Sequence, residues 1–205
     1  MIKLTAKKYN YTIQDNRRVW PKYSKQLLNI ATQNSKATND KVIGSMKELW
    51  LKIRSSGLRG TLANWTKFYN EEWGADGLEQ AGKRVHGMLQ KMQVTWISEA
   101  LCIDYIKELV YNKTCMGLGG EERAIEVAAA HFGLSFRFSD AEEERKGIDG
   151  WIGGKPVQVK PHDSVYKAHV YNHADASKTL VITYKPKQKL CYIHSPEFMD
   201  GANEE

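Results

Sequence analysis

Three polar side chains in the second half of the chain could together carry out metal-assisted hydrolysis. Asp149 lies nine residues before Gln158, and Lys160 follows in the pattern Gln-x-Lys. A carboxylate, an amide oxygen and the backbone carbonyl of Val159 are oxygen ligands of the kind that Mg²⁺ prefers. A lysine ammonium can orient or deprotonate a water molecule and stabilise developing negative charge. These residue types predict a site that uses a bound cation to hydrolyse a phosphodiester.

The glycine pair Gly153-Gly154 indicates how these side chains could meet. Two consecutive glycines can adopt the positive φ values of a two-residue hairpin turn. Such a turn sets residue 152 opposite 155, 151 opposite 156 and 150 opposite 157, and it would set Asp149 opposite Gln158. Directly opposed residues share one face of a sheet, with Cβ atoms ~5 Å apart. Alternation along the strand adds Lys160 to that face and turns the intervening valines toward the core.

An ordinary surface hairpin could carry the same residues. In that case Asp149 and Lys160 would form a salt bridge worth under ~1 kcal/mol and nothing more. The elements around the hairpin must therefore separate the two interpretations.

The chain after Gly117 predicts one helix followed by strands. The segment GGEERAIEVAAAHFG predicts a helix that begins after the glycines and ends at Gly133. Leu134–Phe138 alternates like a strand, and SDAEEERKG is expected to be an acidic loop. TLVITYK and KLCYIH predict two strands joined as a hairpin, whereas residues 162–178 are ambiguous. This order predicts an α/β (α+β) fold with a mixed central sheet flanked by helices.

The chain before residue 117 has mainly helical patterning. Apolar residues recur at three- and four-residue spacing over 23–32, 41–54 and 78–111. A short helix around Trp65, Phe68, Tyr69 and Trp73 is expected to contribute to a core rather than to a base-stacking platform. We therefore expect a mainly helical N-terminal region over residues 1–116 and a catalytic core over 117–205, within one compact unit.

The charge distribution favours a polyanionic partner. Residues 1–60 contain thirteen Lys and Arg against three Asp and Glu, a net charge of +10, while the whole chain carries +6. A basic segment can bind nucleic acid, because neutralising phosphates releases counterions, although a basic surface can also serve solubility alone. No apolar run is long enough to span a bilayer, and no signal peptide is visible. Three cysteines without CxxC spacing suit a reducing cytoplasm.

The order of helix, strand, Asp and Gln-x-Lys over residues 117–160 resembles the PD-(D/E)xK nuclease superfamily. The resemblance identifies Glu122, which opens the helix with Arg123, as the helical metal-site carboxylate. Glu121 and Glu126 are the alternatives, since acidic residues at a helix start can simply complement its dipole. Two departures stand out: Ile148 precedes Asp149 in place of proline, and Gln158 replaces the usual acid.

The segment QLLNIATQNSKATNDKVIGSMKEL resembles the MjaI family of type II restriction enzymes, which cut at CTAG. That resemblance implies a Mg²⁺-dependent, homodimeric enzyme acting on palindromic double-stranded DNA in a prokaryotic cytoplasm. A structure-specific nuclease such as a Holliday-junction resolvase, and a non-catalytic DNA-binding protein with a nuclease fold, are the alternatives. Candidate phosphate and base contacts, chosen by residue type, are Arg17, Arg18, Lys22, Lys25, Gln33, Asn34 and Lys36. His162, His169, His173 and His194 have no recognised metal-binding spacing.

Overall fold

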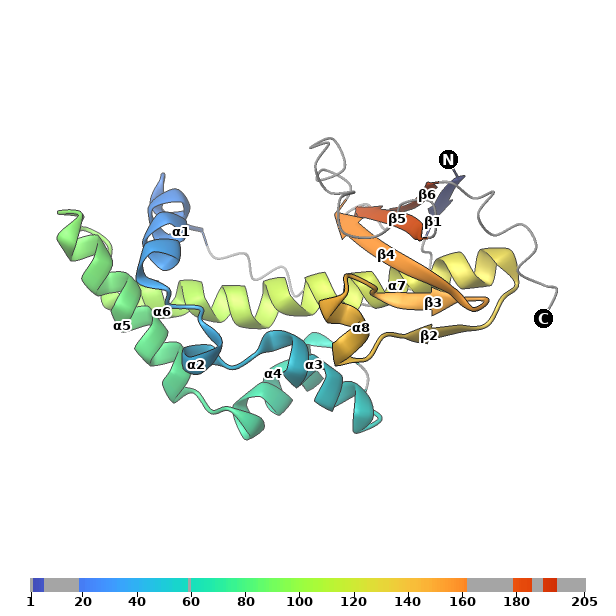
Figure 1. Ribbon diagram of the computed structural model, residues 1–205. Coiled ribbons are helices and arrows are strands. Elements are labelled where there is room, and N and C mark those ends of the chain that lie inside the picture. Colours follow the sequence, from blue (N-terminus) through green and yellow to red (C-terminus); the bar gives the residue numbers. More distant parts are fainter. Residues whose placement is uncertain (1, 6–18, 59, 162–178, 186–189, 195–205) are drawn as a thin grey trace. The chain divides into compact units, whose positions relative to one another are not determined.

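The computed structural model describes residues 2–5, 19–58, 60–161, 179–185 and 190–194 (Figure 1). The chain divides into two compact units: residues 11–115 form a helical unit, and residues 1–10 together with 116–205 form a sheet unit. Arg17, Arg18, His162, His169 and His173 lie outside the described residues. Among the described residues, no helix has the length and apolar character needed to cross a membrane.

The described residues of the helical unit form six helices and a π-helical segment. They are α1 Ser24–Ser35, α2 Asp40–Ile43, α3 Met46–Ser55, α4 Leu62–Glu72, α5 Asp76–Lys91, α6 Glu99–Lys107 and the π-helical segment Glu108–Lys113. The helix predicted over 41–54 is split at Gly44, whose φ of 78° no helix accommodates. The helix predicted over 78–111 is interrupted between α5 and α6, where the Ser98 side chain accepts a hydrogen bond from the Leu101 amide and starts α6 afresh.

Two of the four aromatic side chains expected in the core of the helical unit lie there, whereas Phe68 is half-buried and Trp73 is 42% exposed. Trp65 and Tyr69 are fully buried. The Trp65 indole donates to the carbonyl of Val110 at 2.8 Å, and the Tyr69 hydroxyl donates to the carbonyl of Ile43 at 2.8 Å. These bonds satisfy the polar ends of both rings, so the rings can be buried without leaving a donor unpaired.

A six-stranded mixed sheet organises the second unit. Its strands are β1 Ile2–Thr5, β2 Phe136–Phe138, β3 Gly150–Ile152, β4 Lys155–Pro161, β5 Leu180–Lys185 and β6 Leu190–His194. They lie in the order β1-β6-β5-β4-β3-β2, with β4 parallel to β5 and every other neighbouring pair antiparallel. The predicted mixed-sheet fold is confirmed, whereas β1 was not predicted.

Helix α7, Thr114–Phe132, packs along one face of this sheet (Figure 1). Its residues Ala124, Ile125, Ala128 and Ala129 are buried against Val157, Val159 and the inward residues of β5 and β6. The prediction that this helix begins after the glycines at 119–120 was wrong, because it begins at Thr114.

Contact with Tyr184 of β5 accounts for the glycine at position 120 inside α7. The Tyr184 hydroxyl donates to the carbonyl of Gly117 at 3.2 Å. A Cβ on Gly120 would lie 2.6 Å from the ring atom Cε2 of Tyr184. Glycine costs a helix roughly 1 kcal/mol relative to alanine, and here that cost is offset by close packing of the ring on the helix backbone.

Candidate active site

The hairpin of β3 and β4 has the predicted turn. Gly153 and Gly154 have φ values of 53° and 74°, and Ile152 pairs with Lys155, Trp151 with Pro156, and Gly150 with Val157. Val157 and Val159 are buried in the core, on the face that α7 covers. The predicted register is therefore confirmed for these three pairs.

Asp149 does not continue this pairing, so the prediction that it lies directly opposite Gln158 was wrong. Its backbone N–H donates to the carbonyl of Val157 at 2.8 Å, although Val157 is already the partner of Gly150. Two consecutive residues thus face one residue of β4, which is the arrangement of a β-bulge. A bulge changes the direction of the side chain at that position, so Asp149 no longer follows the alternation of the strand.

The carboxylate of Asp149 lies beside β4, just before the first residue of β3. Its Oδ2 accepts a hydrogen bond from the backbone N–H of Val159 at 2.7 Å. Within an extended strand, the N–H and C=O of one residue point to the same side. The Val159 carbonyl therefore opens on the same side of β4 as the Asp149 carboxylate, which brings together two of the oxygen groups that were predicted as ligands.

Gln158 and Lys160 lie on the face of β4 opposite the core valines. Gln158 is 8% exposed, and its Nε2 donates to the carbonyl of Gly147 at 3.0 Å. Because the amide nitrogen makes this bond, the amide oxygen is directed away from Gly147. Lys160 is half-buried and opposite Thr183 of β5. On the same face, the Thr183 hydroxyl and His194 Nε2 are 3.0 Å apart.

The charges of Asp149 and of Glu121 on α7 both act on the hydroxyl of Tyr184. Burial raises the pKa of the Tyr184 hydroxyl, and the negative charges of Glu121 and Asp149 raise it further. Both carboxylates therefore lie near one phenol. Ile125 of α7 lies close to β3, because a Cβ on Gly150, the residue after Asp149, would be 2.6 Å from Ile125 Cδ1. Glu121 is one helical turn before Ile125 and shares its face of the helix. This helix face points toward the β3 end at which Asp149 lies, whereas Glu122 is rotated by about 100° from it.

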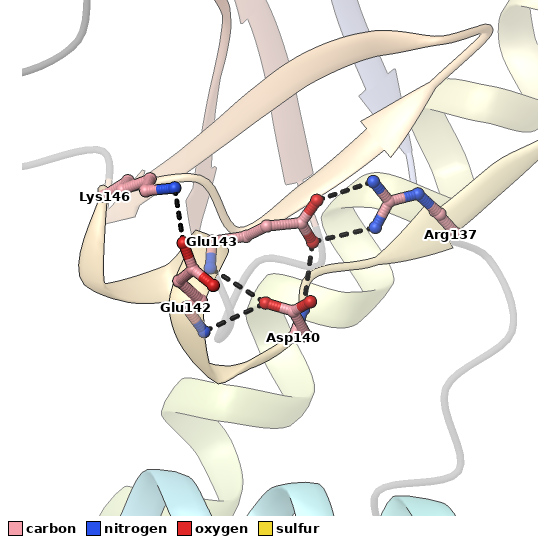
Figure 2. A network of polar contacts seen from close by, with 5 residues as sticks. All are labelled: Arg137, Asp140, Glu142, Glu143 and Lys146. Carbon is pink, nitrogen blue, oxygen red and sulfur yellow. Dashed lines mark hydrogen bonds and ion pairs between the residues drawn. The ribbon is translucent and has the colours of Figure 1, made fainter.

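The segment predicted as an acidic loop contains a short helix, α8 Ala141–Arg145. Asp140 and Glu143 form a capping box, in which Asp140 Oδ1 accepts from the amides of Glu142 and Glu143 and the Glu143 side chain accepts from the Asp140 amide. Figure 2 shows the same Glu143 carboxylate bound by both terminal nitrogens of Arg137 from β2, at 2.8 and 2.6 Å. Chiefly through these hydrogen bonds, Arg137 lowers the pKa of Glu143 to about 2.

The comparison with known protein families settles the family. The model of the MjaI restriction endonuclease family matches residues 25–194, which includes every strand except β1 and all four expected catalytic side chains. The chain belongs to the MjaI restriction endonuclease family. Membership makes it a DNA-cleaving enzyme of the type II restriction class, as the resemblance in the sequence implied.

Two curated relatives support the assignment to the MjaI family. Type II restriction enzyme MthZI of Methanothermobacter thermautotrophicus is 34% identical over 144 residues, which cover 69% of each chain. Type II restriction enzyme MjaI of Methanocaldococcus jannaschii is 30% identical over 186 residues, which cover 88% of this chain and 82% of that protein. No solved structure matches the chain at a significant level.

The candidate ligands of this MjaI-family chain suit a hard cation by their chemistry. Asp149, Gln158 and Val159 offer a carboxylate, an amide oxygen and a backbone carbonyl, all of them oxygen donors. Within the ranges that the structure describes, no three His, Cys, Asp or Glu side chains gather as a metal-binding group. The expected ligands include only two carboxylates, namely Asp149 and one glutamate of α7. The other two oxygen ligands are the Gln158 amide and the Val159 carbonyl.

The candidate DNA contacts that the structure describes lie on α1 and next to its two ends. Lys22, Lys25, Gln33, Asn34 and Lys36 are all exposed. Lys22 and Lys25 line a hollow of about 580 Å³, together with Trp20, Tyr23, Tyr105 and Lys113. The Lys25 ammonium is 2.8 Å from Glu108 Oε1, so an intramolecular ion pair already balances its charge.

Residue-type reasoning alone missed the hydrogen bond between the Gln158 amide and the carbonyl of Gly147. The sequence does carry a signal for it, because Asp140 and Glu143 have capping-box spacing and Gly147 follows the last turn of the helix as a C-terminal glycine would.

Proposed function

We propose that this chain is a Mg²⁺-dependent type II restriction endonuclease that hydrolyses both strands of double-stranded DNA at a short palindrome. One observation supports the site above others: the carboxylate of Asp149 accepts a hydrogen bond from the backbone N–H of Val159 at 2.7 Å. Gln158 and Lys160 flank that point on β4. The recognition sequence CTAG and action in a prokaryotic cytoplasm come from the family resemblance.

In the proposed reaction the side chains divide three tasks. Asp149, Gln158 and the carbonyl of Val159 hold the cation with oxygen ligands. When bound, Mg²⁺ neutralises charge on the scissile phosphate and lowers the pKa of water. Lys160 orients the attacking water from the outer face of β4 and stabilises the charge that develops on the phosphate. The Val159 amide holds the Asp149 carboxylate in place before DNA binds.

Plasmid digestion with purified protein and Mg²⁺ tests the proposal. Discrete fragments that disappear when CTAG sites are removed support it. Cleavage confined to branched DNA favours a junction resolvase instead, and tight binding without any cleavage favours a non-catalytic DNA-binding protein.

Single substitutions test the residues on β3 and β4. Asp149→Ala and Lys160→Ala should each abolish cleavage and leave DNA binding largely intact. Lys155→Ala is the matched control for Lys160, since it removes a lysine from the same strand at the turn. Normal cleavage by Asp149→Ala or Lys160→Ala contradicts the assigned roles.

The helical carboxylate requires a comparison of its own. Family resemblance supports Glu122, whereas the shared influence on Tyr184 supports Glu121, which lies on the face of α7 that reaches the β3 end. Glu121→Gln and Glu122→Gln should differ strongly in cleavage at limiting Mg²⁺. Glu126→Gln is the control, because the Glu126 carboxylate forms an i,i+3 ion pair with Arg123 within α7.

We also propose that the protein acts as a homodimer and binds DNA through side chains on and near α1. A homodimer would place two copies of the site on a palindrome, which sedimentation or light scattering can test. Lys22, Gln33, Asn34 and Lys36 are proposed DNA contacts, together with Lys25 if DNA displaces Glu108 from it. Arg17 and Arg18 are proposed on residue type alone. Loss of a phosphate contact should weaken binding to all sequences equally and reduce its salt dependence.

A further inference from the structure

The side chain of Gln158 is held in place by a backbone carbonyl. Gln158 is 8% exposed, and its Nε2 donates to the Gly147 oxygen at 3.0 Å. An amide has one donating and one accepting end, so this bond determines which way the oxygen points. An ionised carboxylate could not donate here. The carbonyl therefore gives a physical reason for an amide at the position where the superfamily usually has an acid.

The turn that ends α8 presents this carbonyl. The Gly147 amide donates to the Glu144 carbonyl at 2.9 Å, and the Ile148 amide donates to the Glu143 carbonyl at 3.1 Å. This pair of bonds is the Schellman motif, whose key residue adopts the left-handed conformation. Gly147 has φ of 81°, and a Cβ there would lie 3.3 Å from Gln158 Nε2. The positive φ favours glycine, and a Cβ at this distance would displace the Gln158 amide by a few tenths of an ångström.

Helix α8 is itself fixed to the sheet. Arg137 of β2 binds the Glu143 carboxylate with two hydrogen bonds (Figure 2), and its guanidinium lies 4.8 Å from the centre of the Trp151 ring of β3. Bidentate pairs of this kind restrict geometry in addition to attracting charge. The contacts therefore run without a break from β2 and β3, through α8 and Gly147, to the amide of Gln158 on β4.

We propose that Gly147 is a positioning residue, whose carbonyl orients the Gln158 amide so that its oxygen serves as a cation ligand, with α8 as the bracket that holds Gly147. The inference rests on the proposed function in one respect, namely that Gln158 is a ligand. Residues that orient metal ligands typically contribute 10- to 100-fold to metal affinity.

Mn²⁺ binding to the full-length protein without DNA, measured by titration calorimetry, tests this positioning role. Gly147→Ala should weaken Mn²⁺ binding by about 10-fold. Gly133→Ala is the matched control: Gly133 has φ of 68°, but nothing lies within 4 Å of a Cβ there. It imposes similar backbone strain away from Gln158 and should leave Mn²⁺ affinity unchanged. Equal affinities of the two variants would overturn the inference.

A double-mutant cycle separates positioning from a general structural effect. In a Gln158→Ala background there is no amide to orient, so Gly147→Ala should cause no further loss of Mn²⁺ affinity. A full additional loss in that background contradicts the positioning role. Gly147→Asn, which tolerates left-handed φ, should retain more affinity than Gly147→Ala; if the alanine variant does not fold, Gly147→Asn is compared with Gly133→Asn. Absence of Mn²⁺ binding by the wild-type protein would instead refute the proposed cation site.

Discussion

Replacing Glu143 by glutamine tests how strongly α8 is fixed to the sheet. Glutamine can still accept the hydrogen bond from the Asp140 amide and keep the capping box, so the substitution removes mainly the charge that faces Arg137. The pKa of Glu143 is lowered from 4.5 to about 2. At about 1.4 kcal/mol for each pH unit, this shift corresponds to at most ~3.4 kcal/mol. The Arg137 side chain is 55% exposed, and solvent screening reduces the expected loss to about 1 kcal/mol.

The sign of the pH dependence follows from the lowered pKa. Stability from the ionised Glu143 is fully present above pH 4.5, and it is lost as the pH falls toward 2. The free energy of urea unfolding, followed by circular dichroism, should therefore differ between wild type and Glu143→Gln at pH 7, and the difference should shrink below pH 4.5. Glu142→Gln is the control, since its i,i+4 pair with Lys146 is largely exposed. Equal losses for the two variants at pH 7, or a difference at pH 2 as large as that at pH 7, would refute the reasoning.

Three further predictions concern packing and reactivity. Gly120→Ala should destabilise the sheet unit by about 1–3 kcal/mol in urea unfolding, because its Cβ would clash with the Tyr184 ring, whereas Gly117→Ala, with nothing within 4 Å of its Cβ, should not; equal effects exclude the clash as the cause. Trp65→Phe should lower stability by about 1–3 kcal/mol in thermal unfolding, since the buried Val110 carbonyl loses its donor; an unchanged Tm contradicts this. Burial raises the pKa of Cys102 and Cys191 to about 11, so neither thiol should react with an aromatic disulfide reagent at pH 8 until the protein is unfolded, and rapid labelling of the native protein speaks against that burial.

Local patterns in the sequence were sufficient to predict the hairpin that carries Gln158 and Lys160. Two glycines determine a two-residue turn, and alternation determines which residues face the core. The same rules failed at Asp149, because a bulge adds one residue to one strand and ends the alternation there. Nothing in the local sequence marks that bulge. It becomes visible only in the hydrogen bonds of Asp149 with Val157 and Val159.

The helix that leads to the site shows a second kind of failure. The glycines at 117–120 predicted a helix start, because glycine destabilises a helix interior. Tertiary packing against Tyr184 outweighs that local preference, and it depends on a strand more than 60 residues later in the chain. The family pattern identified Glu122, with Glu121 and Glu126 as the alternatives, because the glutamate that turns toward the β3 end depends on how α7 packs on the sheet.

Strand β1 has a consequence for how the protein folds. It forms one edge of the sheet by pairing Ile2 with Ile193 and Lys3 with Tyr192, whereas all residues of the helical unit lie between these partners in the chain. Contacts between residues so far apart in sequence are slow to form, because most of the chain must be ordered before they can be made. During synthesis the helical unit can fold from its own contiguous residues, while the sheet that supports Asp149 and Lys160 is complete only after β6 has been made. The order of translation therefore places completion of the nuclease sheet after synthesis of the whole helical unit.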